Sequence, residues 1–176
     1  DNGVLYNKDK TELLMCPKML TGEFVIPEGL ARISSGAFSY CTSLSNVVIP
    51  SSTQEIGDLA FSLCNFSQIA IPDSVRELGE GAFWKTPLVH ISLPNSLTTI
   101  KDVTFVECSA LESVIIPSSI TQIENCPFNG CQSLKTICFF GNAPEMDEDV
   151  FNDWNLVKAA TLYYLPGTSG WTTPTW

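Results

Sequence analysis

A repeat of 22 or 23 residues constrains the fold of this 176-residue chain more than any other feature of its sequence. Three kinds of residue recur with this period, and all three keep the same phase, which is the signature of a repeat architecture. The prolines are Pro27, Pro50, Pro72, Pro94 and Pro117. The phenylalanines are Phe38, Phe61, Phe83, Phe105, Phe128 and Phe151. The aliphatic column is Ile33, Ile56, Leu78, Ile100, Ile123 and Met146.

Within each repeat, the three residues before the proline alternate between apolar outer positions and a variable middle position. The four segments are 47–49, 69–71, 91–93 and 114–116. This period-2 pattern predicts a short strand with one buried face, which the proline ends because it cannot donate to a ladder. A second short strand is expected to lead to the aliphatic column. A tight bend then follows at Gly57 and Gly79. The Ala-Phe pair is expected in a loop or a single helical turn.

One such repeat cannot bury its own apolar face, whereas stacked repeats form a continuous core. The predicted fold is therefore a β-rich solenoid, a right-handed leucine-rich-repeat-type stack of short strands, turns and single helical turns. We predict one repeat domain over residues 1–176. It has an N-terminal hairpin cap at 1–21, repeats at 22–140, and a last repeat with a C-terminal cap at 141–176. Trp171 and Trp176 are expected to cover the open end of the core.

The repeat resembles that of the BspA-like leucine-rich-repeat family, and the resemblance covers essentially the whole chain. Its unit, I-x-I-P-x-S-V-x-x-I-G-x-x-A-F-x-x-C-x-x-L, recurs with small changes at 69–88 and 112–134. The segments 3–6 and 162–171 are similar to that family's ends. The resemblance implies a secreted or cell-surface protein of a host-associated microbe, with a binding role and no catalytic motif. The sequence departs from the pattern at Trp84, Thr86, Thr104 and Pro127.

Composition excludes several classes of partner. The net charge is −10 and the nine basic residues are scattered singly, which excludes a nucleic-acid partner and disfavours an anionic membrane surface. No apolar run approaches the roughly 18 residues of a membrane-spanning helix, and no signal peptide is present. The chain opens at Asp1 without Met, which suggests a mature fragment or an excised piece of a longer protein. We expect a monomer.

The seven cysteines and the one histidine offer little chemistry. Four cysteines share one repeat slot, which predicts a packed, reduced column rather than disulfides or a metal site, because Thr86 takes the same slot. Cys16, Cys126 and Cys138 lie outside that column and their role stays open. We expect no cofactor and no metal. The slot is Cys41, Cys64, Cys108 and Cys131.

Two catalytic or metal interpretations are weak. His90 lies at the flank of a predicted strand, in a slot held elsewhere by Asn and Gln, so a solvated histidine is expected instead of a general base. The acidic residues between 145 and 153 lack the loop pattern that fixes calcium ligands, and acidic residues 147–149 suit the first turn of a short helix.

The candidate binding surface is the outward face of the predicted strands. Middle positions form an apolar strip with a more polar strip beside it, and exposed apolar patches often mark contacts. Trp84, which occupies a slot that is otherwise polar, is a second candidate. The alternatives are that β propensity explains the strip and that Trp84 folds over a neighbouring repeat. The residues are Val25, Val48, Ala70, Ser92, Ile115, Asn46, Gln68, His90, Ser113 and Trp84.

These observations favour a non-enzymatic extracellular or cell-surface adhesion module that recognises a host or microbial surface protein or glycan. A rigid structural spacer within a larger surface protein is the alternative. An enzyme built on His90 is the remotest possibility.

Overall fold

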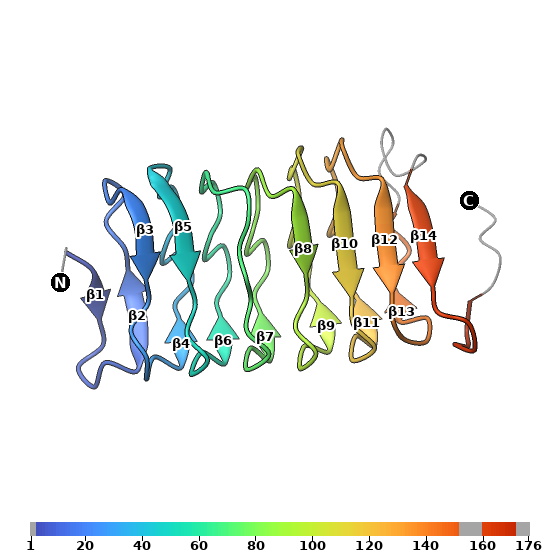
Figure 1. The fold of residues 1–176 in the computed structure, drawn as a ribbon, viewed down its shortest axis with the longest axis horizontal. Coiled ribbons are helices and arrows are strands. Elements are labelled where there is room, and N and C mark those ends of the chain that lie inside the picture. The colour runs from blue at the N-terminus through green and yellow to red at the C-terminus, as the bar shows by residue number, and fades with distance from the viewer. Residues whose placement is uncertain (1–2, 152–159, 172–176) are drawn as a thin grey trace.

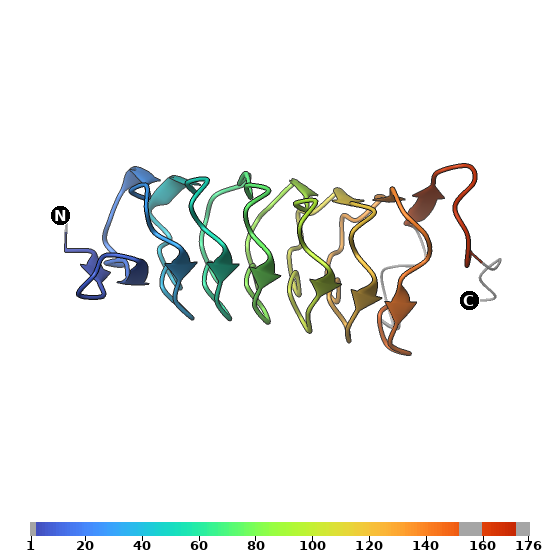
Figure 2. The same cartoon turned by 90° about the horizontal axis from the view of Figure 1, so that it is seen from below.

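The computed structural model describes residues 3–151 and 160–171 and shows a β-solenoid of stacked coils (Figures 1 and 2). Each regular coil carries one strand on each of two sides. The first row comprises β3 (Gly22–Val25), β5 (Leu44–Val48), β8 (His90–Ser92), β10 (Ser113–Ile116), β12 (Thr136–Phe139) and β14 (Thr161–Tyr164). The second row comprises β2 (Glu12–Met15), β4 (Arg32–Ile33), β6 (Glu55–Ile56), β7 (Glu77–Leu78), β9 (Thr99–Ile100), β11 (Gln122–Ile123) and β13 (Glu145–Met146).

The ends of the array depart from this plan. At the N-terminus, β1 (Leu5–Tyr6) pairs antiparallel with β2, which gives the hairpin that the sequence predicts. Near the other end, the Trp171 ring lies 4.7 Å from the Phe139 ring and stacks on Tyr164 at 5.1 Å. Trp171 therefore packs against the core as expected, while Trp176 lies outside the described residues.

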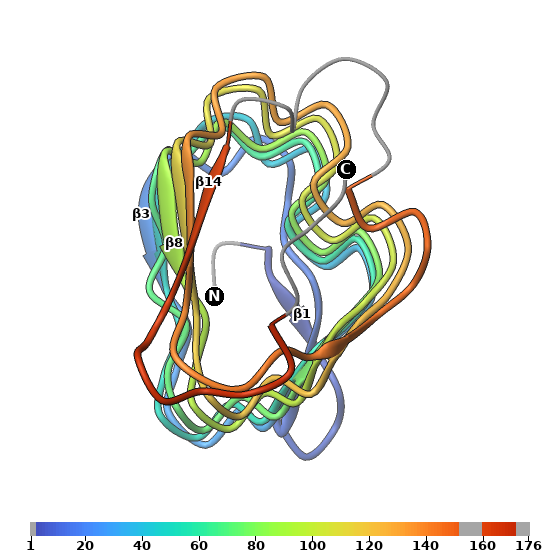
Figure 3. The ribbon, with the colours of Figure 1, turned by 90° about the vertical axis from the view of Figure 1, so that its right-hand side faces the viewer.

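The core is a column of phenylalanine rings, one from each coil. Consecutive ring centroids from Phe38 to Phe128 are 5.1, 5.5, 5.7 and 5.8 Å apart, and the last three pairs are within 7° of parallel. All five rings are fully buried. The predicted stacking of the repeats on one continuous core is confirmed. Viewed along the long axis, the coils superimpose (Figure 3).

The segment that carries each phenylalanine, here called the Phe turn, is not helical. In the described residues no helix occurs, so the Ala-Phe pairs lie in loops and the predicted single helical turns are wrong there. A short helix that begins at the acidic residues 147–149 would extend beyond the described residues. Each Phe turn instead donates backbone hydrogen bonds to the next coil. The amide of Phe38 bonds the carbonyl of Ala60, Phe61 bonds Ala82, and Phe83 bonds Thr104, at 2.8–3.0 Å. Pairing between coils satisfies the backbone polar groups that a helical turn would have paired internally.

This pairing requires left-handed backbone at two slots of each Phe turn. The first slot holds Gly36, Leu59, Gly81, Val103 and Cys126, and the second holds Tyr40, Leu63, Lys85, Glu107 and Gly130. Their φ angles lie between 50° and 77°. Only glycine adopts this region without steric cost, so seven of the ten positions carry backbone strain.

The first row of strands is interrupted at residues 67–71. The sequence predicts a strand at Ile69-Ala70-Ile71, but none forms, and β5 and β8 belong to separate sheets. The side chains of Ile69 and Ile71 still point into the core, each about 9% exposed. The alternation of apolar residues at 69–71 therefore reflects burial of the two isoleucines and not pairing of the backbone in a sheet.

The interruption coincides with a change in loop length. Two residues separate Cys41 from Leu44 and Cys108 from Leu111, but only one separates Cys64 from Phe66 and Thr86 from Leu88. The two middle repeats are thus one residue short between the Phe turn and the strand. The shortening alone does not prevent a ladder, because β8 follows an equally short loop and still pairs in register with β10.

The second row divides at the same place along the array. β7 and β9 belong to separate sheets, and an ion pair between Lys101 Nζ and Glu77 Oε1 at 2.7 Å connects the two coils there. The Phe turns remain bonded without interruption, since Leu63 donates to Trp84 at 2.8 Å and Lys85 to Val106 at 2.9 Å. The middle of the solenoid is therefore held by its Phe turns and its ring stack.

Candidate functional site

The strand face, meaning the outward surface of the first row together with residues 67–71, brings most of the predicted residues into one strip. Parallel register aligns Val25 with Val48 before the interruption, and Ser92 with Ile115 after it. Val25 is 59% exposed, and Val48 and Ile115 are each 40% exposed. These apolar side chains form an accessible column along the solenoid.

The column continues beyond the residues that the sequence singled out. Ile115 aligns with Cys138, and Cys138 aligns with Tyr163 of β14, whose ring is 56% exposed. Sequence reasoning assigned Tyr163 to the C-terminal cap. The signal that identifies it is the same alternation in Leu162-Tyr163-Tyr164, with the middle residue outward.

The polar strip lies beside the column and is hydrogen-bonded at two places. Asn46 Nδ2 donates to Glu23 Oε2 at 2.8 Å, and His90 Nδ1 lies 2.8 Å from Ser113 Oγ. His90 is exposed and bonded to its neighbour in the same strip. Within the described part of the chain, no group of three His, Cys, Asp or Glu residues is arranged to hold a metal ion.

Gln68 and Ala70 lie on the strand face within the interrupted segment. Both are exposed, but neither belongs to a strand. The strip is therefore continuous as a surface, while its backbone support is missing at these two residues.

Trp84 lies apart from the strand face, on a Phe turn. Its ring is half-buried, and Lys85 Nζ lies 4.9 Å from the ring centre. Lys85 Nζ is also 3.1 Å from Glu107 Oε2. Two attractions therefore act on this exposed ammonium group, one from a ring face and one from a carboxylate.

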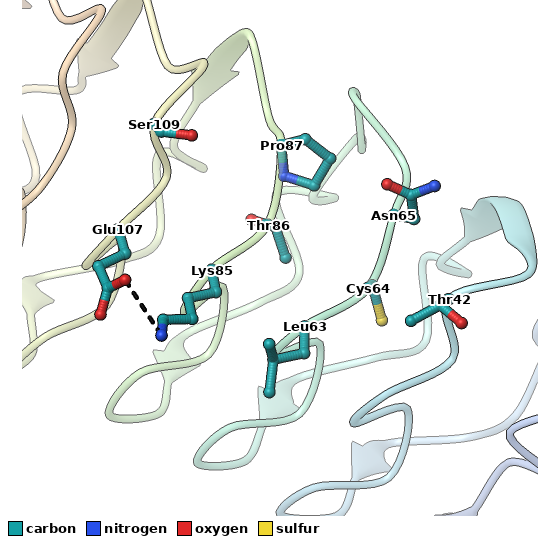
Figure 4. A pocket seen from close by; sticks show the side chains of 9 residues that line it. All are labelled: Thr42, Leu63, Cys64, Asn65, Lys85, Thr86, Pro87, Glu107 and Ser109. Atoms are coloured by element: carbon teal, nitrogen blue, oxygen red, sulfur yellow. Dashed lines mark ion pairs between the residues drawn. The ribbon is translucent and has the colours of Figure 1, made fainter.

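A hollow of about 230 Å³ opens beside this group, between the Phe turns and the strand face (Figure 4). The buried residues of its lining, Cys64 and Thr86, form its floor. The remaining lining residues form its rim: Thr42, Leu63, Asn65, Lys85, Pro87, Glu107 and Ser109. The rim residues come from four successive coils, and the two middle coils are those with the shortened loop. The missing residues account for the space.

The polar groups at the floor of the hollow already have hydrogen-bond partners within the protein. Cys64 Sγ donates to the carbonyl of Phe38 at 3.1 Å, and Thr86 Oγ1 donates to Phe83 at 2.8 Å. Burial raises the pKa of the Cys64 thiol to about 12, so it stays protonated near neutral pH. The groups available to a ligand are on the rim.

The buried thiols form the predicted column. Cys108 Sγ and Cys131 Sγ donate to the carbonyls of Phe83 and Phe105, at 3.0 and 3.1 Å. Burial raises the pKa of Cys108 to about 11. At the N-terminal end, a hydrogen bond from the Cys16 thiol lowers the pKa of Cys41. Each ladder thiol satisfies a carbonyl of the preceding coil, which is a structural role.

The coils, the ring stack and the exposed strand face together define a bacterial-type leucine-rich-repeat solenoid. The family described as "BspA type Leucine rich repeat region (6 copies)" matches residues 18–135 and 61–162, and the chain belongs to this family. The resemblance seen in the sequence is confirmed.

Solved structures similar to this chain are of bacterial repeat proteins. A leucine-rich cell surface protein from Faecalibacterium prausnitzii is 33% identical over 79% of this chain, with a TM-score of 0.73. A leucine-rich-repeat protein of T. pallidum is 30% identical over 79% of this chain, with a TM-score of 0.69. One from Eubacterium ventriosum is 26% identical over the whole chain, with a TM-score of 0.66. No curated protein matches the chain.

The chain spans only part of these proteins, covering 38%, 70% and 51% of their respective lengths. Among the residues that the structure describes, no helix has the length and apolar character to cross a bilayer. The family is a protein-binding repeat family, and its fold is generally a non-enzymatic scaffold.

Proposed function

We propose that this chain is a non-enzymatic, cell-surface adhesion module that recognises a surface protein or glycan of the host or of another microbe through its strand face and flanks. The observation that supports this most is the exposed column of Val25, Val48, Ile115 and Tyr163, bordered by a hydrogen-bonded polar strip. Exposed apolar side chains on one face, bordered by polar groups, often mark a recognition surface.

Size limits the affinity of one copy. Strands about 4.8 Å apart give a strip roughly 30 Å by 10 Å, or about 300 Å². A standard interface buries about 800 Å² on each partner. One copy is therefore expected to bind weakly, and several copies on a surface would gain strength through avidity.

The test is a binding screen against matrix proteins, mucins and glycans, with the chain displayed in many copies. Val48→Asp and Ile115→Asp place a charge in the apolar column and should each weaken capture by about tenfold or more, since a buried unpaired charge costs well over 1.4 kcal/mol. Gln54→Asp adds the same charge at an exposed position away from the strand face and serves as the control. A blank screen, or equal capture by all three variants, contradicts the proposal.

A further inference from the structure

We propose that the hollow beside Trp84 is a second binding site, and that it takes an uncharged sugar ring. The site lies on the flank of the solenoid, separate from the strand face. It rests on the proposed function only in treating the chain as a binding module.

The hollow is built by loop length. On one side, the longer loop after Cys41 closes a tight turn, in which Thr42 donates to Tyr40 at 2.8 Å. On the other side, the longer loop after Cys108 closes the equivalent turn, in which Ser109 donates to Glu107 at 2.8 Å. The two shortened loops between them lack the residue that would fill this space. The result is a depression with two raised walls.

The charges at the rim cancel. Lys85 and Glu107 are 3.1 Å apart, and they are the only ionisable rim groups besides the protonated thiol below them. A ligand with net charge would have to compete with this pair. A neutral ligand can use the second carboxylate oxygen, the remaining ammonium protons and the Asn65 amide without leaving any charge unbalanced.

The remaining lining matches the two kinds of surface that a pyranose presents. Its hydroxyl groups both donate and accept hydrogen bonds, as do Thr42, Asn65 and Ser109 at the rim. Its C–H face is apolar, as are the side chains of Leu63 and Pro87. A hollow of about 230 Å³ is below the range of about 300–1,000 Å³ typical of drug-sized ligands, so it suits one ring and not a longer segment.

The rim is also held in place before any ligand arrives. Lys85 Nζ contacts both the Trp84 ring and Glu107. Leu63, Lys85 and Glu107 all occupy left-handed backbone, with φ of 58°, 55° and 57°, where the next coil has Gly130. The same backbone recurs in every Phe turn, where pairing between coils requires it, so hydrogen bonds between stacked coils anchor the rim backbone. A rim backbone that is already ordered lowers the entropy cost of binding.

Saturation-transfer NMR tests the inference, with neutral methyl glycosides of glucose, galactose, mannose and N-acetylglucosamine as probes. We expect at least one to bind, and Asn65→Ala and Glu107→Gln each to weaken it about tenfold, the loss expected for one hydrogen bond to a polar or charged group. Glu112→Gln is the control, because it removes a carboxylate that pairs with Lys135 at 3.0 Å outside the hollow. This variant should bind the glycoside as the parent does. All three variants should keep the melting temperature of the parent.

Several outcomes would overturn the inference: no neutral glycoside binds, glucuronic acid or a peptide binds in preference, or Glu112→Gln loses as much as Glu107→Gln. The Val48→Asp variant separates this site from the strand face. Sugar binding retained in Val48→Asp supports an independent site. Sugar binding lost there, with the fold intact, contradicts it. Failure of the surface screen with sugar binding intact would remove only the strand-face proposal.

Discussion

Val103 is the most strained residue of the Phe turns. It is β-branched, its φ is 51°, and the residue is 38% exposed, so packing compensates only part of the strain. We predict that Val103→Asn raises the free energy of unfolding by about 0.5–1 kcal/mol, since Asn tolerates left-handed backbone far better. Thermal melting checks this as a higher midpoint.

The control for Val103→Asn is Gly81→Ala in the same slot. Gly81 has φ of 57°, and an added Cβ would lie 2.7 Å from Leu59 Cδ2. This variant should lower the midpoint. An unchanged or lower midpoint for Val103→Asn would show that the valine contributes a contact that outweighs its backbone strain.

The thiols give a second prediction at the residue scale. With pKa values raised to about 12 and 11, Cys64 and Cys108 should resist iodoacetamide at pH 8, where about one part in a thousand of Cys108 is thiolate. Half-buried Cys138 should be alkylated first. Peptide mass spectrometry of the folded protein measures this. Equal labelling of Cys64 and Cys138 would contradict the buried column.

The sequence was sufficient to predict the buried residues, but not the residues with left-handed backbone. The periodic Phe and Cys slots could be assigned from sequence because burial follows hydrophobic side chains directly. The left-handed slots could not, because Leu59, Lys85 and Glu107 carry none of the glycine signal that marks such backbone. The hollow was missed as well: Trp84, which the sequence singled out, lies beside it, but none of its rim residues was predicted.

At the scale of elements, the missing strand at 67–71 follows the first of the two shortened loops, so the contribution of that loop can be tested directly. We predict that inserting a serine between Asn65 and Phe66 restores the longer loop, allows residues 67–71 to pair with β5, and raises the melting midpoint. Hydrogen exchange at these amides is the measurement, and it should become slower. Deleting Ser43 is the matched control, since it shortens the loop before β5 and should open the β3–β5 pairing.

Most elements were predictable from the sequence pattern. The two exceptions both concern backbone pairing between coils, which the pattern of a single repeat does not report. The second-row strands form as expected, and from β4 to β13 each ends on a residue of the aliphatic column. The Phe turns were expected to include helical turns, but the helical alternative satisfies backbone groups locally, whereas stacked coils satisfy them between repeats. The strand at 69–71 was predicted from alternation, which reports burial and not pairing.

At the scale of the whole molecule, stability is shared between neighbours. We predict that Phe83→Ala costs about 3–5 kcal/mol and uncouples the two ends, because Phe83 stacks on both Phe61 and Phe105 where the strand ladders are interrupted. Denaturant unfolding should change from one transition to two. Phe140→Ala, at a 47% exposed ring, should change stability by less than about 0.5 kcal/mol. A single transition in Phe83→Ala would count against this coupling.

Native-state hydrogen exchange of the unmodified chain tests the central claim most directly, namely that the middle coils are held by Phe turns and stacked rings in place of strand ladders. The amides of Phe61, Leu63, Phe83 and Lys85 should exchange as slowly as those of β10 and β12, while the amides of 69–71 exchange much faster. Equal protection at 69–71 and in β10, or fast exchange throughout the Phe turns, would contradict it.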